Sequence, residues 1–158
     1  MGKKTGPNPT DRAKRGTKRS LLTDGQGLPL GVAVAGANRN DFKLARETLE
    51  ALAVPRPAPA GQARQNLCLD KGYDYPEIRA LAEEYELTAH IRGRGEEARA
   101  CQRGVRQKAR RWVVERTHSW LNRFRDILTR WCKKAENYLG MLHLALGIIT
   151  WRQLNLSG

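Results

Sequence analysis

The sequence predicts an α/β fold in which a mixed sheet is flanked by helices. The first observation is the order of the predicted elements, because a strand pair comes first, helices and strands then alternate, and helices close the chain. This order is typical of a sheet layered between helices. The second observation is size, since 158 residues, of which 40% are hydrophobic, can bury one substantial core.

The N-terminal part of the chain predicts an arm followed by a hairpin. Residues 1–18 are basic and interrupted by glycine and proline, so we expect an extended arm, with residues 19–158 forming the folded domain. Segments with apolar side chains at 19–23 and 28–35 flank a D-G-Q-G turn, which is typical of a β-hairpin. Asp24 opens this turn and is explained by turn chemistry, so we do not assign it to a metal site.

The middle of the chain alternates between helix and strand patterns. Leucines spaced along residues 42–52 predict a helix with Asp41 as its cap, and a proline-rich segment then ends it. A short strand over 67–69 ends at Asp70, and residues 87–91 predict one more strand.

The segment after Asp70 predicts a capped helix. Asp74 and Glu77 have the D-x-x-E spacing of a capping box, and Pro76 suits a first helical turn. Because Asp74 is the better cap, Asp70 is left without a structural role. Asp70 also follows a strand, and ligands gather at the carboxyl ends of strands in α/β sheets, which makes it a candidate functional residue.

The C-terminal part predicts helices from about Ala98 onward, with a break near Gly140. At about 100° per residue, a helix over 112–131 has one apolar stripe and carries Glu115 on the other side. The stripe consists of Val113, Trp120, Phe124, Ile127 and Trp131. Glu115 is thus not a core residue, and one interpretation is a surface ion pair with Arg111, worth only a few tenths of a kcal/mol.

The chain is strongly basic, with a formal net charge of +13 and a pI near 10.3. This charge indicates a polyanionic partner, either nucleic acid or an anionic membrane surface. Residues 92–134 hold 14 Lys and Arg against 4 Asp and Glu, interleaved with aromatic residues, which predicts a phosphate-binding face on a helix that also packs into the core. We expect no secretory signal and no membrane span, because the longest apolar stretches fall short of the roughly 20 residues that a bilayer helix needs.

The cysteines and acids indicate a compartment and a kind of site. Three widely spaced cysteines are typical of a reducing environment, so we expect a cytoplasmic protein. A zinc site built from Cys101, His90 and His118 is conceivable, but its spacing matches no ligand template. The acids Asp70 and Glu115, set in a basic chain, favour a divalent cation bound between protein and phosphate.

Two longer motifs contain these acids. Residues 67–74, LCLDKGYD, and residues 111–125, RWVVERTHSWLNRFR, together resemble the DDE transposases of the IS-four and IS-five insertion-sequence superfamily. Residues 4–12, KTGPNPTDR, and the turn at 24–27 resemble the same family, so the likeness spans nearly the whole chain.

The resemblance implies a ribonuclease-H-like domain in which three carboxylates hold divalent metal ions, with Asp70 as the second and Glu115 as the third. Mg²⁺ or Mn²⁺ is the implied ion, since hard oxygen ligands and phosphates suit it. With water as the nucleophile, such a site cleaves the end of an insertion sequence. With a 3′-hydroxyl as the nucleophile, it joins that end to target DNA.

Double-stranded DNA in the bacterial nucleoid is the implied partner. Cations near the acids are expected to hold its phosphates, although the same cations can equally be solvated or paired with the acids. These cations are Lys71, Arg111, Arg116 and Arg123.

The sequence departs from the family at its start. The family's first aspartate lies on an opening strand upstream of the K-T-G-P-N-P stretch, which here begins at Lys4. Asp11 and Asp24 match other family positions, so we expect a partial domain without its first strand and first carboxylate. The exposed hairpin edge would then pair with another copy, as a homo-oligomer, or with a missing N-terminal half. We expect such a chain to bind DNA but to cut and join it poorly by itself.

Two functions from different classes are therefore compared. The first is the catalytic portion of a DNA transposase, active once its N-terminal part is supplied. The second is an inert fragment that binds DNA or inhibits full-length oligomers. An RNA-binding protein has little support, because the aromatic residues follow core periodicity and no RNA-recognition motif is present.

Overall fold

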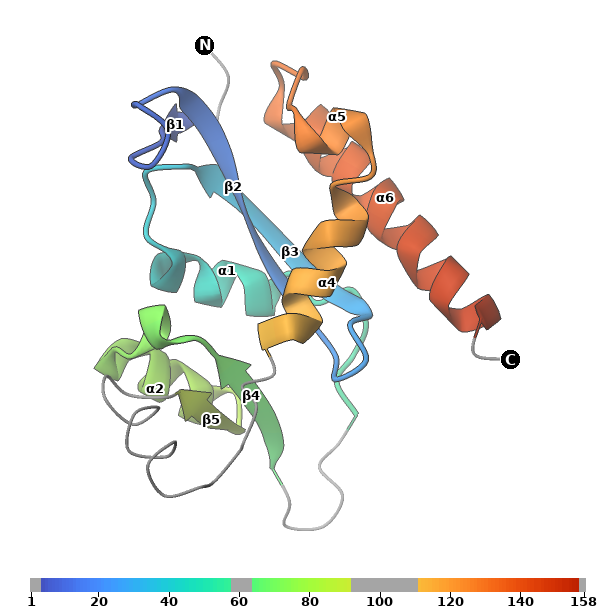
Figure 1. Ribbon diagram of the computed structural model, residues 1–158. Coiled ribbons are helices and arrows are strands. Elements are labelled where there is room, and N and C mark those ends of the chain that lie inside the picture. The colour runs from blue at the N-terminus through green and yellow to red at the C-terminus, as the bar shows by residue number, and fades with distance from the viewer. Residues whose placement is uncertain (1–3, 58–63, 92–110, 157–158) are drawn as a thin grey trace, which may run out of the picture. The chain divides into compact units, whose positions relative to one another are not determined.

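The chain folds into two compact units of helices and strands. The computed structural model describes residues 4–57, 64–91 and 111–156 (Figure 1). Unit 1 comprises Met1–Ala53 and Val113–Gly158, and unit 2 comprises Val54–Trp112. The placement of one unit relative to the other is not determined.

Unit 1 contains a three-stranded antiparallel sheet in the order β1–β2–β3. β2 (Arg15–Thr23) and β3 (Pro29–Gly36) form the predicted hairpin, which is thereby confirmed. The short β1 (Gly6–Pro7) pairs with the start of β2. The Asp24 carboxylate closes the hairpin turn, because it accepts hydrogen bonds from the N–H groups of Gln26 at 2.9 Å and Leu28 at 2.8 Å.

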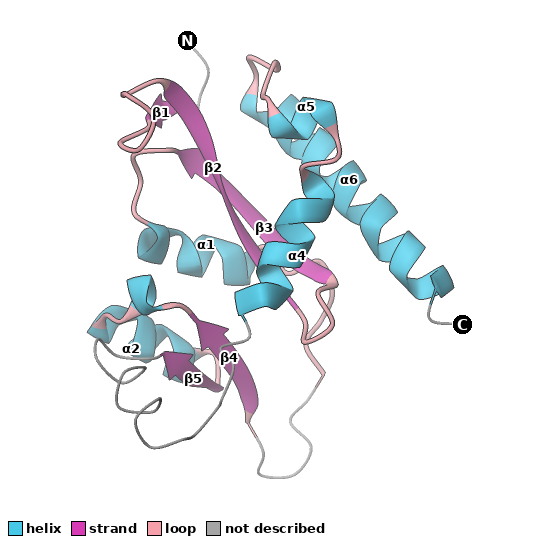
Figure 2. Cartoon of the chain, viewed as in Figure 1, coloured by secondary structure: helices cyan, strands magenta, loops and turns pink. Residues whose placement is uncertain are grey.

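Helices cover both faces of this sheet (Figure 2). Gly31 and Val32 lie on opposite faces of β3, because side chains alternate along a strand. Gly31 lies against the backbone of α1 (Ala45–Glu50), where a Cβ would stand 2.9 Å from the carbonyl oxygen of Thr48. Val32 packs with the C-terminal helices. β3 is therefore buried on both faces, and its sequence is a continuous apolar run rather than an alternation of apolar and polar residues.

The C-terminal layer consists of α4 (Arg111–Leu121), α5 (Arg125–Leu128) and α6 (Ala135–Leu156). These helices and β3 share one hydrophobic core. Its buried residues are Val32, Val34, Leu121, Ile127, Tyr138, Leu142, Ala145, Leu146 and Ile149.

The prediction of one helix over 112–131 is wrong. Leu121 and Ile127 are both buried in the core, yet on a straight helix six residues would place them about 120° apart. The chain therefore leaves the helix after Leu121 and re-enters it in α5, so that both side chains face the core. Trp131 follows α5 and is 77% exposed, so it does not belong to the apolar stripe.

Gly140 does not break the C-terminal helix, contrary to the prediction. It lies inside α6, where a glycine costs about 1 kcal/mol relative to alanine. The buried side chains along α6 stabilise the helix by more than that. The part of the predicted helical region between residues 98 and 110 lies outside the described residues.

The predicted helix over 42–52 forms as two shorter pieces. A 3₁₀ turn, η1 (Asp41–Leu44), leads directly into α1. Asp41 is not a cap, contrary to the prediction, because the N-cap position of η1 is Asn40. The Asn40 side chain makes no capping hydrogen bond. The Asp41 carboxylate instead pairs with Lys18 at 3.1 Å.

Unit 2 is built around two parallel strands, β4 (Gln65–Leu69) and β5 (Leu87–Ile91), which confirms both predicted strands. The short η2 (Lys71–Tyr73) follows β4, and α2 (Pro76–Glu84) leads to β5. In the described part of this unit, the buried apolar residues are Leu67, Ile78, Leu81, Ala82, Leu87 and Ile91.

The predicted mixed α/β class is confirmed by these elements. The ribonuclease-H-like sheet and its missing first strand stay predictions, because the antiparallel sheet and the parallel pair belong to separate units. The division into an arm at 1–18 and a domain at 19–158 also stays a prediction, and β2 begins at Arg15. Within the described residues, no helix is both long enough and apolar enough to cross a bilayer.

Candidate active site

Asp70 lies at the carboxyl end of β4, where the chain turns into η2. Its backbone is extended, with φ of −79° and ψ of 172°, and its Oδ1 accepts a hydrogen bond from the Gly72 N–H at 2.8 Å. The carboxylate therefore caps the turn that follows it. Asp70 is also exposed, so an ion in solution can reach it.

The structural roles expected of Asp70 and Asp74 are reversed. The N-cap of α2 is Tyr75, which is extended because a residue before proline avoids the helical region, and it makes no side-chain cap bond. Asp74 Oδ1 instead accepts a hydrogen bond from Arg79 at 2.8 Å. The inference that Asp70 has no structural role is therefore wrong. Its candidacy depends on its place at the end of a strand and on the motif around it.

Glu115 lies on the exposed side of α4. The opposite side of this helix carries Val113, Thr117 and Leu121, which follow one another at intervals of one turn and are all buried. This arrangement confirms that Glu115 is not a core residue. The alternative ion pair with Arg111 is untested, because the side chain of Arg111 lies outside the described residues.

Two neighbours of Glu115 fasten α4 to the β2–β3 turn. Thr117 is fully buried, and its Oγ1 donates a hydrogen bond to the Gly27 carbonyl oxygen at 2.7 Å. Arg116 donates a hydrogen bond to the Gln26 carbonyl oxygen and lies over the Trp120 ring at 5.1 Å. Gly27 has a φ of +88°, and a Cβ there would stand 2.9 Å from Arg116 Nη2. These contacts fix the rotation of α4 and hence the direction of Glu115.

The four cations predicted to bind phosphate occupy different settings. Lys71 is exposed in η2, next to Asp70, and Arg123 is exposed just after α4. Arg116 is partly buried and already contacts the hairpin turn. Arg111 begins α4, and its side chain is not described. Of the three cations whose side chains are described, Lys71 and Arg123 are exposed, and their contact with DNA stays a prediction.

His118 lies one turn after Glu115 in α4. Burial, and to a lesser degree the positive charge of Arg19, lower the pKa of His118 below its ordinary value of 6.5. The imidazole is therefore mostly neutral near pH 7. It adds little to the positive charge around Glu115.

The donor atoms suit a hard divalent ion. Both candidates are carboxylates, and Mg²⁺ is usually held by one or two protein carboxylates together with phosphate oxygens. Within the described parts of the chain, no three His, Cys, Asp or Glu side chains lie close enough together to hold an ion. Asp70 belongs to unit 2 and Glu115 to unit 1, so their convergence on one ion stays a prediction. The zinc alternative is likewise untested, because Cys101 lies outside the described residues.

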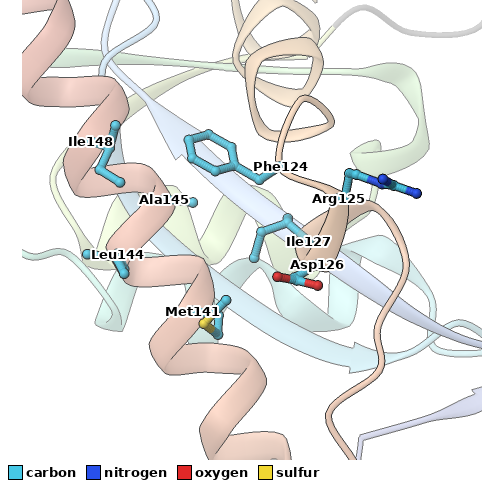
Figure 3. Close-up of a pocket in the computed structure, with 8 residues that line it drawn as sticks. All are labelled: Phe124, Arg125, Asp126, Ile127, Met141, Leu144, Ala145 and Ile148. Carbon is cyan, nitrogen blue, oxygen red and sulfur yellow. The ribbon is translucent and has the colours of Figure 1, made fainter.

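A small hollow lies between α5 and α6, and neither Asp70 nor Glu115 is among the residues that line it (Figure 3). Its volume is about 130 Å³, well below the roughly 300 Å³ at which ligand pockets begin. The lining is apolar apart from Arg125 and Asp126, and Arg125 points away from α6. The hollow is too small for a nucleotide, so we do not assign a substrate to it.

Thr117 and Gly27 are site residues that the sequence analysis missed. A signal for Thr117 was present, because a lone polar residue lies on the apolar side of the helix, one turn from both Val113 and Leu121. No signal paired it with Gly27, since the two positions are 90 residues apart.

Comparisons with known proteins agree with the motifs around the acids. A family model described as a transposase DDE domain matches residues 2–150. A Burkholderia cepacia protein named as the transposase for insertion sequence element IS402 is 35% identical to this chain over an alignment 158 residues long. The alignment covers 96% of this chain and 70% of that relative. No solved structure matches the chain.

Proposed function

The chain belongs to the family of transposases with a DDE domain, and from that premise we propose that it carries out DNA strand cleavage and strand transfer for an insertion sequence. In this proposal Asp70 and Glu115 hold one shared Mg²⁺ or Mn²⁺ ion. The strongest support for this proposal is that both acids are exposed to solvent, while hydrogen bonds hold the backbone around them in place. Asp70 is held by its cap on η2, and Glu115 by the bonds of α4 to the hairpin turn.

The proposed roles follow from these settings. When bound, the ion would stabilise the attacking and leaving oxygens at phosphorus. Asp70 is oriented by its bond to Gly72 N–H, and Glu115 is directed away from the core by the buried side of α4. Lys71 is exposed next to Asp70, and Arg123 is exposed just after the helix that carries Glu115. Both supply positive charge for the phosphates of double-stranded DNA.

A third carboxylate is part of the proposal, and neither Asp11 nor Asp24 provides it. Asp24 Oδ1 closes its own hairpin turn, and this residue matches the turn position of the family rather than its first aspartate. Asp11 lies in the turn between β1 and β2 and pairs with Lys14 at 3.8 Å. An acid outside residues 1–158, in the same polypeptide or in another, would complete the set. We therefore expect this chain alone to bind DNA and to cleave it weakly.

Cleavage of labelled DNA carrying the ends of the chain's own element tests the proposed roles. The residual Mn²⁺-dependent cleavage should fall by more than roughly 100-fold in Asp70→Asn and in Glu115→Gln. Glu77→Gln and Glu136→Gln are matched controls, because Glu77 is an exposed acid on a helix of unit 2 and Glu136 is an exposed acid on a helix of unit 1. Both control variants should cleave like the wild type. Unchanged cleavage by Asp70→Asn would contradict the assignment, and robust strand transfer by the wild type alone would contradict the need for a third acid.

A further inference from the structure

Trp131 is the most exposed large hydrophobic side chain that the structure describes, at 77% exposure. It lies in the loop between α5 and α6, and Lys133 and Lys134, which are also exposed, follow it after Cys132. An indole left in water between cations gains nothing for the fold. Such a combination is typical of surfaces that bind nucleic acid, where cations hold phosphates and aromatic rings stack on bases.

The loop that carries Trp131 is anchored on both sides of this residue. Arg130 Nη1 donates a hydrogen bond to Thr17 Oγ1 in β2 at 2.8 Å, and its Nε donates to the Cys132 carbonyl oxygen at 3.0 Å. The Arg130 guanidinium also lies over the Tyr138 ring at 5.2 Å, and Cys132 packs against the core. Trp131 is therefore held outward between two inward-facing neighbours.

The same anchor joins this loop to a second group of cations. Arg130 Nη1 also reaches the Lys4 carbonyl oxygen at 3.4 Å, so the loop lies beside the β1–β2 end of unit 1 (Figure 1). Arg15 is two residues before Thr17 in β2, on the same face and about 7 Å along the strand. The turn before it presents two more exposed cations, with Asp11 as its acid. We call this surface the basic end, and it comprises Arg12, Lys14, Arg15, Trp131, Lys133 and Lys134.

We propose that the basic end is a second DNA-binding surface of the transposase, in which Trp131 stacks on an unpaired base while the surrounding cations hold the adjacent phosphates. This inference rests on the proposed function, since staggered cleavage of two DNA strands leaves single-stranded ends. A blunt duplex hides the faces of its bases, whereas a single-stranded tail exposes them. The surface should therefore favour tailed DNA over blunt DNA.

Fluorescence anisotropy with the full chain tests this inference. The probes are a labelled blunt duplex and the same duplex with a short single-stranded thymidine tail. The tail should raise the affinity of the wild type, and Trp131→Ala should lose that gain, roughly 5- to 150-fold. Trp131→Phe should keep most of it, because a phenyl ring also stacks. Replacing Lys133 and Lys134 by alanine should weaken binding to both probes and reduce the salt slope by about 2.

Trp151→Ala is the matched control, because Trp151 is another exposed indole of unit 1, at 66% exposure. Trp151 lies toward the far end of α6, roughly 24 Å along the helix from Ala135, where the loop that carries Trp131 ends. This variant should keep the full gain from the tail. Equal thermal unfolding of the variants shows that they are folded. If Trp131→Ala binds both probes like the wild type, or if Trp151→Ala loses the gain equally, the inference is wrong while the proposed function stands. If the wild type binds neither probe, both are wrong.

Discussion

Asp70 combines a structural bond and a proposed chemical role in one carboxylate. Its bond to Gly72 N–H needs only an acceptor oxygen, whereas a metal ion needs the negative charge. Sequence reasoning found Asp70 through its motif but assigned the cap to Asp74. Spacing alone does not reveal that Arg79 engages the Asp74 carboxylate, so this part of the prediction failed.

The two roles of Asp70 can be separated by substitution. Asp70→Ala should lower the free energy of unfolding by about 1 kcal/mol, because the cap of η2 is lost. Asp70→Asn should cost only a few tenths of a kcal/mol, since its amide oxygen still accepts the Gly72 N–H. Urea unfolding followed by circular dichroism measures both values. Equal destabilisation by the two substitutions would show that charge, rather than the hydrogen bond, holds the turn.

His118 should make stability depend on pH. Burial and Arg19 lower its pKa in the folded chain below the ordinary 6.5, so the unfolded chain binds more protons in the window below that value. The free energy of unfolding should therefore rise with pH through this window. The contribution of the neutral imidazole to stability should be lost progressively as the pH falls below 6.5. His118→Gln should flatten this dependence in urea unfolding between about pH 5.5 and about pH 7.5, one unit to either side of the ordinary pKa. An identical pH dependence in the two proteins would contradict the assignment.

At the scale of elements, local signals were predictable and core geometry was not. The hairpin was correctly predicted because two apolar segments and the Asp24 turn specify it within a few residues. The break after Leu121 was not, because it exists to bring Leu121 and Ile127 to the same core. A helical pattern read along one segment contains no information about where the facing sheet lies.

Two glycines test this account of packing with opposite signs. Gly31→Ala should lower the free energy of unfolding by about 1–3 kcal/mol, because the new Cβ meets the α1 backbone at 2.9 Å. Gly140→Ala should raise it by about 0.5–1 kcal/mol, since nothing lies within 4 Å of a Cβ there and the site is helical. Differential scanning calorimetry measures both shifts. Two changes of the same sign would show that the contact of β3 with α1, or the helical state of residue 140, is misassigned.

At the scale of the whole molecule, the motifs identified the acids and the family but could not assemble the site. Asp70 and Glu115 are 45 positions apart in the sequence and lie in different units, so no local pattern fixes the distance between them. The net charge of +13 indicated a nucleic-acid partner without showing where it binds. The exposure of Trp131 was hidden for the same reason, because its spacing fits an apolar stripe that the fold interrupts.

The central claim is that one divalent ion joins Asp70 to Glu115. Electron paramagnetic resonance of free Mn²⁺, titrated with the full chain, measures binding by the wild type, Asp70→Asn, Glu115→Gln and the double variant, with Glu77→Gln as the control. Each single substitution should weaken binding as much as the double substitution does, because both side chains hold the same ion. Losses that add independently, or wild-type binding by Glu115→Gln, would contradict it.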